Sequence, residues 1–255
     1  MAKNKTAPPV KSILISQPPP ENGKSPFLDI ANKYKIKVDF RPFIEVQPVS
    51  YKDFRKNKIE IPEYTAVIFN SRNSVDHFFR ICEESRLKIS QDMKYFCISE
   101  SIALYLQKYI LYRKRKVFFG NGSNSSLIEL VIKHKEKERF LLPCSDVHKK
   151  DALDTLKKND VNFDMAIMYK TVSTDLSDLK DLTYDAIIFF SPAGLKSLFE
   201  NFPDFKQNKT RIGGFGPYTE KAIQDAGLEM QIKAPTKDTP SMTMAIEKYI
   251  NQVNK

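Results

Sequence analysis

The sequence contains few of the features on which disulfide, zinc and membrane proteins depend. Its three cysteines, Cys82, Cys97 and Cys144, have no CxxC spacing and cannot all pair, so neither a disulfide framework nor a structural zinc site is expected. No apolar run approaches the length of a transmembrane helix, and the apolar patch near the N-terminus is too short for a signal peptide. These absences favour a soluble protein of the reducing cytoplasm.

The usual catalytic motifs are missing as well. The sequence has no GxSxG, P-loop, HExxH or complete GxGxxG motif, and Gly213–Gly216 is too irregular for a dinucleotide loop. The histidines His77, His134 and His148 lack a partner at metal-binding spacing, so we expect surface or capping roles for them. The remaining classes are an enzyme that acts by positioning and electrostatics, and a binding protein.

One segment occurs twice. Tyr64–Phe79 (YTAVIFNSRNSVDHFF) aligns without a gap with Tyr184–Phe199 (YDAIIFFSPAGLKSLF), and six of the paired positions are identical. Each copy is an apolar run, a serine and an amphipathic segment, which predicts a buried strand that ends at the serine and leads directly into a helix. The repeat indicates two similar sheets in one chain.

Strands and helices are predicted to alternate from Lys11 to the C-terminus. Alternation of this kind is typical of parallel sheets covered by helices on both faces, which is an α/β fold. Lys37–Val49 and Phe163–Ser173 are longer extended stretches than the others, so they are the best candidates for crossings between two domains. Pro42 and Pro48 argue against a central strand throughout the first stretch.

The formal net charge of +10 suggests an acidic partner, which could be a nucleic acid, an anionic membrane or a small polyanion. A lysine-rich surface that only keeps the protein soluble would explain the charge equally well. The basic clusters Arg113–Lys116 and Lys133–Arg139 precede predicted strands and fit solvated loops or helix ends. They carry no RNA-binding or helix-turn-helix pattern, so we expect no nucleic acid and no membrane among the partners.

Small or hydroxylated residues follow nearly every predicted strand. Ligands of parallel α/β sheets bind at the carboxyl ends of the strands, where such residues let backbone N–H groups and helix dipoles approach an anion. Each residue alone is an ordinary helix N-cap, worth about 1 kcal/mol, but their repetition on the same edges favours an anion-binding cleft. The positions are Ser16-Gln17, Ser71-Arg72-Asn73, Ser99-Glu100-Ser101, Gly120-Asn121-Gly122-Ser123, Ser145-Asp146, Ser191-Pro192-Ala193-Gly194 and Gly216-Pro217-Tyr218-Thr219.

Four short motifs, in their order and spacing, resemble those of the uroporphyrinogen-III synthase (HemD-like) family. The family's strand ending in Thr-Ser is similar to Asn70-Ser71, and its strand ending in Ser-Pro is similar to Ser191-Pro192. Its Ile-Gly-x-x-Thr-Ala signature resembles Phe215–Glu220, and its Tyr-x-Thr motif resembles Tyr169–Thr171. The resemblance covers nearly the whole chain from Lys11 onward.

The resemblance implies two parallel-sheet α/β domains joined by a two-stranded linker. On this interpretation domain 1 is discontinuous and comprises 11–43 plus 173–255, and domain 2 comprises 48–166. The linker strands are 44–47 and 167–172, and 1–10 is a flexible N-terminus.

The resemblance also implies the reaction. Linear hydroxymethylbilane is closed to uroporphyrinogen III with inversion of ring D, through a spiro intermediate in the interdomain cleft, as a step of haem and other tetrapyrrole biosynthesis. No metal or organic cofactor is implied. The implied enzyme is a cytoplasmic monomer, and any protein partner would be a transient one, hydroxymethylbilane synthase at handover.

Tyr169 is the candidate catalytic residue. A phenol of pKa about 10 can protonate the departing hydroxyl at neutral pH, although a packing role between the domains is the alternative. The eight carboxylates of the substrate match a basic protein with a rim of backbone donors. The candidate substrate-binding residues are Ser71, Arg72, Asn73, Ser191, Pro192, Ala193, Gly194, Gly216, Pro217, Tyr218 and Thr219.

Four positions depart from the family pattern. Gln17 follows the first strand where the family often has an arginine, Ser99 replaces a glycine, and Ile102 and Glu220 replace a threonine and an alanine. The alternative to the enzyme is therefore a non-catalytic two-domain protein that binds a polyanionic small molecule on the same scaffold. A nucleic-acid binder ranks third.

Overall fold

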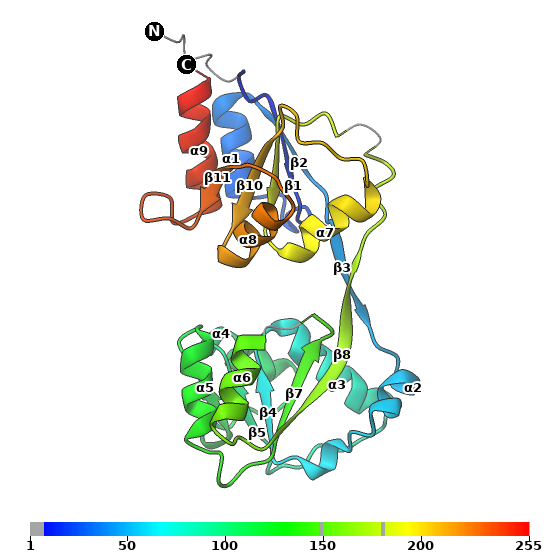
Figure 1. The fold of residues 1–255 in the computed structure, drawn as a ribbon. Coiled ribbons are helices and arrows are strands. Elements are labelled where there is room, and N and C mark those ends of the chain that lie inside the picture. The colour runs from blue at the N-terminus through cyan, green and yellow to red at the C-terminus, as the bar shows by residue number, and fades with distance from the viewer. Residues whose placement is uncertain (1–7, 148–149, 180–181, 255) are drawn as a thin grey trace. The chain divides into compact units, whose positions relative to one another are not determined.

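The computed structural model of the chain describes residues 8–147, 150–179 and 182–254, and these form two mainly parallel sheets (Figure 1). One sheet has the strand order β11-β10-β9-β1-β2 and the other the order β3-β8-β7-β4-β5-β6. The strands are β1 (Ser12–Ile15), β2 (Lys37–Phe40), β3 (Ile44–Pro48), β4 (Ala66–Phe69), β5 (Lys94–Cys97), β6 (Val117–Phe119), β7 (Phe140–Ser145), β8 (Phe163–Ser173), β9 (Ala186–Phe189), β10 (Arg211–Phe215) and β11 (Met230–Ala234). The predicted α/β fold class is confirmed.

Apart from α2, which lies between β3 and β4, and α9, which follows the last strand, the helices connect successive parallel strands. They are α1 (Pro26–Tyr34), α2 (Tyr51–Phe54), α3 (Arg72–Glu84), α4 (Glu100–Tyr105), α5 (Asn124–Ile132), α6 (Lys150–Lys158), α7 (Pro192–Asn201), α8 (Pro217–Asp225) and α9 (Met242–Val253). Short 3₁₀ helices are η1 (Arg55–Asn57), η2 (Ile61–Glu63), η3 (Leu106–Lys108) and η4 (Lys114–Lys116). No helix in the described ranges is both long and apolar enough to cross a membrane.

The chain divides into two compact units. Unit 1 contains the described residues up to Glu45 and from Val172 onward, and unit 2 is Val46–Thr171. The chain leaves unit 1 within β3 and returns within β8 (Figure 1).

These two strands pair antiparallel, as two hydrogen bonds between them show. The N–H of Val49 donates to the carbonyl of Met168 at 3.0 Å, and that of Thr174 donates to the carbonyl of Phe43 at 3.0 Å. The earlier residue, Phe43, is bonded to the later Thr174, and the later residue, Val49, to the earlier Met168. The two segments therefore run antiparallel.

In unit 1 the sheet is buried on both faces. β9 and all of β1 after Ser12 are buried apolar runs, as parallel strands covered on both sides require. Residues of α1 and α9 pack in one core cluster, and residues of α7 and α8 pack in the other. β10 carries two glycines because its neighbours approach closely: a Cβ on Gly213 would lie 2.5 Å from Cδ1 of Ile188.

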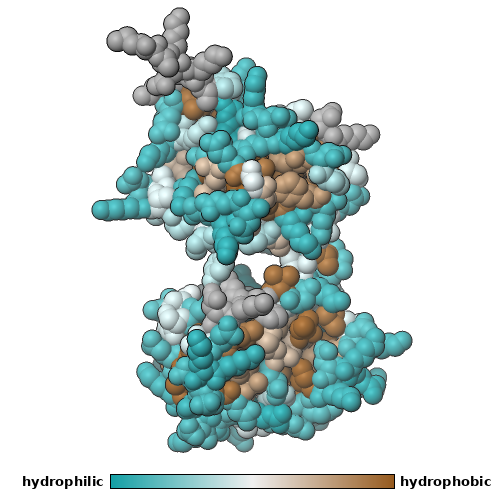
Figure 2. Space-filling model, in the orientation of Figure 1, coloured by the Kyte–Doolittle hydropathy of each residue, from teal (hydrophilic) through white to brown (hydrophobic). Residues whose placement is uncertain are grey.

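In unit 2 the sheet is likewise covered on both faces. Residues of α3 and α4 belong to one core cluster and residues of α5 and α6 to the other. The repeated segment thus gives one central strand to each unit, β4 between β7 and β5 in unit 2 and β9 between β10 and β1 in unit 1. The face drawn in Figure 2 is mostly hydrophilic in both units and carries several apolar patches.

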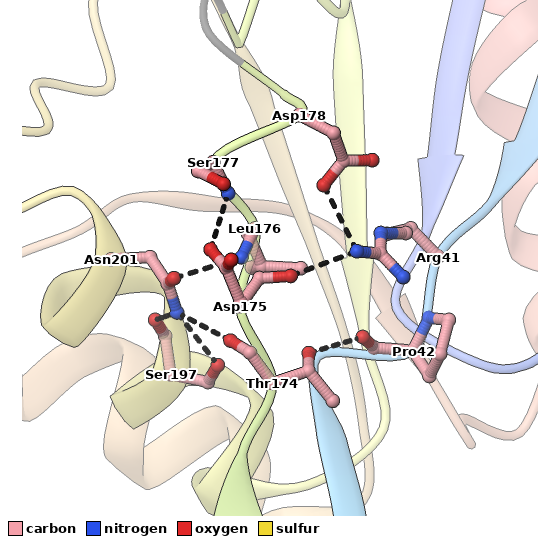
Figure 3. Close-up of polar contacts among 9 residues, drawn as sticks. All are labelled: Arg41, Pro42, Thr174, Asp175, Leu176, Ser177, Asp178, Ser197 and Asn201. Atoms are coloured by element: carbon pink, nitrogen blue, oxygen red, sulfur yellow. Dashed lines mark hydrogen bonds and ion pairs between the residues drawn. The ribbon is translucent and has the colours of Figure 1, made fainter.

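A network of polar contacts holds the chain where β8 returns to unit 1 (Figure 3). The Asn201 amide, at the end of α7, donates to the carbonyls of Thr174 and Ser197 at 2.9 Å each, and its oxygen accepts from the N–H of Leu176 at 2.9 Å. The hydroxyl of Thr174 donates to the carbonyl of Pro42 at 2.6 Å. The segment before β3 and the segment after β8 are therefore hydrogen-bonded to each other, and Asn201 bonds the second of them to α7.

Two features differ from the sequence analysis. Val10, expected in a flexible terminus, is 1% exposed and exchanges hydrogen bonds with the side chain of Asn254 at 2.7 and 2.9 Å, because its apolar side chain completes the core beside α9. Residues 1–7 of that segment lie outside the described ranges. The helix α2 was not predicted, and Ser50 is its N-cap: the hydroxyl of Ser50 accepts from the N–H of Asp53 at 3.1 Å.

Candidate functional site

Ser71 follows the end of β4 and caps the start of α3 through a capping box. Its hydroxyl accepts from the N–H of Ser74 at 3.1 Å, and the Ser74 hydroxyl accepts from the N–H of Ser71 at 3.2 Å. The described residues provide no acceptor for the N–H groups of Arg72 and Asn73. Two amide donors at the positive end of a helix dipole are thus left for an anion.

Tyr169 lies in β8 next to Ser71. Its side chain is buried, and burial raises the pKa of its phenol, while a hydrogen bond with the Ser71 side chain works in the opposite direction. The raised pKa keeps the hydroxyl protonated at neutral pH, as a proton donor requires. The structure therefore brings two of the predicted site residues together.

His77, one helical turn into α3, has a contact at this edge that the sequence did not indicate. Its ring stacks on that of Tyr169, and its Nδ1 accepts a hydrogen bond from Nε of Arg80 at 3.3 Å. Burial and then the charge of Arg80 lower the pKa of His77, whereas Asp76 raises it. His77 is thus a half-buried, neutral packing partner of the phenol.

Arg80 of α3 binds the backbone on both sides of the β3–β8 pair. Its Nη2 donates to the carbonyls of Val49 and Met168 at 2.8 and 3.1 Å, and its Nη1 pairs with Glu84 at 2.6 Å. Since Met168 directly precedes Tyr169, this contact holds the backbone that carries the phenol.

The ends of β7 and β8 are joined around Asp146. Its carboxylate accepts from the N–H of Thr171 at 3.0 Å, from the Ser145 hydroxyl at 2.8 Å and from the N–H of Val147 at 3.0 Å. Burial raises the pKa of Asp146, but these hydrogen bonds outweigh it and the pKa is lowered. Asp146 therefore acts as a fixed anchor of this turn.

Arg72 supplies positive charge at this edge. It is exposed, and its guanidinium carbon lies 5.1 Å from the centre of the Tyr105 ring, whose hydroxyl donates to Asp76 at 2.9 Å. Within the described ranges Arg72 forms no ion pair, so its guanidinium can donate hydrogen bonds to a carboxylate.

In unit 1 the equivalent edge is formed by the start of α7. The Ser191 hydroxyl accepts from the N–H of Gly194 at 3.2 Å, Pro192 has no N–H, and no described residue accepts from the N–H of Ala193. A Cβ on Gly194 would lie 3.7 Å from the hydroxyl of Ser16, so the ends of β1 and β9 meet at this helix.

The start of α8 lies beside it. Gly216 has φ +86°, which favours glycine, and its N–H donates to the carbonyl of Ala234 at 2.7 Å. Pro217 and Tyr218 are exposed, whereas Thr219 is 2% exposed and packs its methyl group toward Gly214. The other member of the signature, Glu220, pairs with Lys233.

A row of four phenylalanines at this edge of unit 1 is a feature that the sequence analysis missed. The ring centroids are 6.1 Å apart for Phe27 and Phe40, 6.2 Å for Phe27 and Phe190, and 6.1 Å for Phe190 and Phe215. Phe215 is 37% exposed and ends the row at the surface. The sequence did contain a sign of this row, because Phe40 and Phe215 end the strands β2 and β10 and Phe190 directly follows β9.

The described residues contain no group of three or more His, Cys, Asp or Glu side chains arranged for a metal ion. His134 packs its ring against Phe96 and Phe118, and His148 lies outside the described ranges. The three cysteines are free and buried, and burial raises the thiol pKa to about 12 for Cys82 and Cys97 and to about 11 for Cys144.

A sequence model of the uroporphyrinogen-III synthase HemD family matches residues 29–244. The chain belongs to this family. A comparison with curated protein sequences found no match. The matched range includes every candidate site residue, and membership indicates an enzyme of the uroporphyrinogen-III synthase type.

Two solved structures show the same fold. One is a mutant uroporphyrinogen III synthase from the extremely thermophilic bacterium Thermus thermophilus, 13% identical, with a TM-score of 0.59 over 96% of this chain and 99% of the other. The second is uroporphyrinogen-III synthetase from Helicobacter pylori, 18% identical, with a TM-score of 0.59 over 94% of this chain and 99% of the other. These likenesses place the chain in the two-domain fold of the family.

Proposed function

We propose that the chain closes hydroxymethylbilane to uroporphyrinogen III, using side chains and amides at the carboxyl ends of both sheets. Family membership supports the reaction, and the contact between Tyr169 and Ser71 supports the assignment of roles. Tyr169 is the proposed proton donor, and Ser71 is the residue that orients its hydroxyl.

The first step is loss of water from the hydroxymethyl carbon of the substrate. The phenol of Tyr169 gives its proton to the leaving hydroxyl while the pyrrole nitrogen supplies the electron pair, so an azafulvenium-like electrophile and water are formed. The already substituted α carbon of ring D attacks this electrophile and gives a spiro-pyrrolenine. The spiro centre then fragments, ring D re-adds through its free α carbon, and loss of a proton restores the aromatic pyrrole.

Binding of the substrate carboxylates is proposed to rest on backbone donors and one cation. The open amides of Arg72, Asn73 and Ala193 lie at helix N-termini, where an anion is stabilised by about 0.3–1 kcal/mol per helix end. The guanidinium of Arg72 adds a charged donor. Phe190 and Phe215 offer flat apolar surface on which a pyrrole ring can stack.

Most of the rate enhancement is proposed to come from folding the flexible bilane so that its two ends meet. Such proximity effects are worth up to about 7–11 kcal/mol in well-oriented systems. The remaining site residues, Ser191, Pro192, Gly194, Gly216, Pro217, Tyr218 and Thr219, are proposed to shape the backbone that receives the substrate.

We also infer that the protein acts as a cytoplasmic monomer that receives its unstable substrate from hydroxymethylbilane synthase in a transient contact. The free, buried thiols support a reducing compartment. Light scattering on the purified protein tests the monomer, and a dimer at micromolar concentration would overturn it.

The deciding experiment supplies hydroxymethylbilane to the purified protein and resolves the uroporphyrinogen isomers by chromatography. We expect isomer III in excess over the spontaneously formed isomer I. Isomer I alone would disprove the activity and leave the non-catalytic binding protein as the remaining function.

A further inference from the structure

A cavity of about 640 Å³ lies within unit 2, and it does not involve the candidate site. Met93 and Lys116, which directly precede β5 and β6, are among its lining residues. Ser71, by contrast, follows the carboxyl end of β4, which runs parallel to β5. The cavity and the candidate site are therefore on opposite edges of the same sheet, and the cavity has the volume of a small-molecule site.

The walls of the cavity are largely aromatic and aliphatic. Phe79 of α3 and Tyr109 stack with their ring centroids 4.5 Å apart and their planes 2° apart, and Tyr95 lies 6.5 Å from Phe79. Leu111 also lines the cavity and is 79% exposed, which is unusual for a leucine on a folded surface. Walls of this kind suit a flat apolar body.

Tyr95 contributes a polar group to this lining. The residue is 5% exposed, yet none of the described residues forms a hydrogen bond with its hydroxyl. Solvent reaches this hydroxyl, because it is not among the buried polar atoms of the described residues that lack a partner. A ligand with a hydrogen-bonding atom at this point would take the place of water there.

Three of the four charged side chains of the lining are cationic. Lys88, Arg113 and Lys116 line the cavity, against one carboxylate, that of Glu83. Lys116 is occupied by Asp92 at 2.7 Å, whereas Lys88 and Arg113 form no ion pair within the described part of the chain. Two cations therefore remain for an anionic group.

We propose that this cavity binds a small amphipathic anion, with a flat aromatic body against the aromatic wall of Phe79, Tyr95 and Tyr109 and one carboxylate or sulfonate at Arg113. All lining residues of the cavity belong to unit 2, so binding there is independent of the proposed synthase activity.

The test uses full-length protein and 1-anilinonaphthalene-8-sulfonate, followed by fluorescence and by calorimetry for stoichiometry. We expect one saturable site per chain. Arg113→Gln should weaken binding about tenfold, and Tyr95→Phe about threefold, since hydrogen bonds to charged groups are the stronger ones. Arg115→Gln, an exposed neighbour that does not line the cavity, should change the affinity less than about twofold, in keeping with the small effect of solvated surface charges.

Two competitors with the same ring system, one charged and one neutral, distinguish the contribution of charge to binding from that of apolar contact. 2-Naphthoate should displace the probe, whereas the neutral 2-naphthalenemethanol should displace it only at much higher concentration. The proposal is overturned by binding that does not saturate at one site, by equal effects of Arg113→Gln and Arg115→Gln, or by equal competition from the two naphthalenes. Arg113 is only half-buried at the surface, so its replacement keeps the test valid even if Tyr95→Phe does not fold.

Discussion

The ring of His77 stacks on the ring of Tyr169, with centroids 4.8 Å apart and planes inclined by 20°. The phenol is thereby packed on one face by an imidazole whose pKa is lowered by burial and by Arg80. A neutral neighbour adds no positive charge that would favour the phenolate. This arrangement leaves the hydroxyl of Tyr169 in its acid form.

Replacing Tyr169 by Phe should slow turnover without abolishing it. General acids contribute about 10²- to 10⁴-fold, and we expect the lower end because proximity supplies most of the effect. The measurement is the rate of uroporphyrinogen III formation under saturating substrate. Tyr64→Phe is the control, because Tyr64 is a buried tyrosine of unit 2 whose hydroxyl donates to Asp164 at 2.8 Å, and it should keep wild-type activity. Complete loss of turnover in Tyr169→Phe would contradict a mechanism shared among many groups.

Acid should destabilise the protein partly through His77. Its pKa in the folded state is lowered from the ordinary value of 6.5, so the unfolded chain binds the proton first as the pH falls. The contribution of His77 to stability is therefore present above pH 6.5 and is lost as the pH drops toward the lowered pKa. Urea unfolding of wild type and His77→Phe between about pH 7.5 and pH 5 checks this, because Phe keeps a ring against Tyr169 and removes the titration. The free energy of unfolding should fall more for the wild type than for the variant over this pH range. An equal fall in both proteins would contradict the lowered pKa of His77.

Arg72→Gln should raise the KM for hydroxymethylbilane while leaving kcat nearly unchanged. A guanidinium that binds a substrate carboxylate equally in ground and transition states contributes uniform binding, and its loss costs about tenfold in KM. Arg86→Gln serves as the control, because Arg86 is exposed beyond the end of α3. If kcat fell and KM stayed constant, Arg72 would have to contact the reacting atoms instead.

Gly213→Ala should destabilise unit 1 by about 1–3 kcal/mol, the usual cost of an added methyl group in a tight core. The new Cβ would lie 2.5 Å from Cδ1 of Ile188 and 3.3 Å from Cβ of Ile232. Ile188→Val removes that Cδ1, and alone it should cost about 0.5–1.5 kcal/mol. In thermal unfolding, the double variant should therefore be more stable than the sum of the single changes. Strict additivity would show that the two side chains do not compete for this space.

The sequence predicted the parts of the fold that depend on neighbouring residues. Ala66–Phe69 and Ala186–Phe189 are continuous apolar runs followed by a capping serine, so both the buried strands and the helices after them were predictable. The contact between Tyr169 and His77 was not, because periodicity shows which face of α3 is buried but not which distant strand meets it. Val10 was assigned to a flexible end for the same reason, since its partners are residues of α9 at the other end of the chain.

The candidate site was predictable to a similar extent. The N-cap positions at Ser71 and Ser191 follow from local sequence, and the structure shows both serines capping their helices. Phe27, Phe190 and Phe215 come from separate elements, and only the strand order brings their rings into one row. Tertiary neighbours of this kind leave no signal in a single segment.

The pairing of β3 with β8 also bears on the order of folding during synthesis. β1 lies between β2 and β9, yet β9 is made only after the whole of unit 2. A two-stranded β1–β2 sheet is only marginally stable by itself, so unit 1 cannot fold before its second half has been synthesised. Because Val49 and Met168 are hydrogen-bonded neighbours, the folded insert has already brought the two ends of unit 1 together when β9 emerges. The entropy of closing that long loop is then lost in the folding of the insert, and β1 meets β9 as if the two segments were close in sequence.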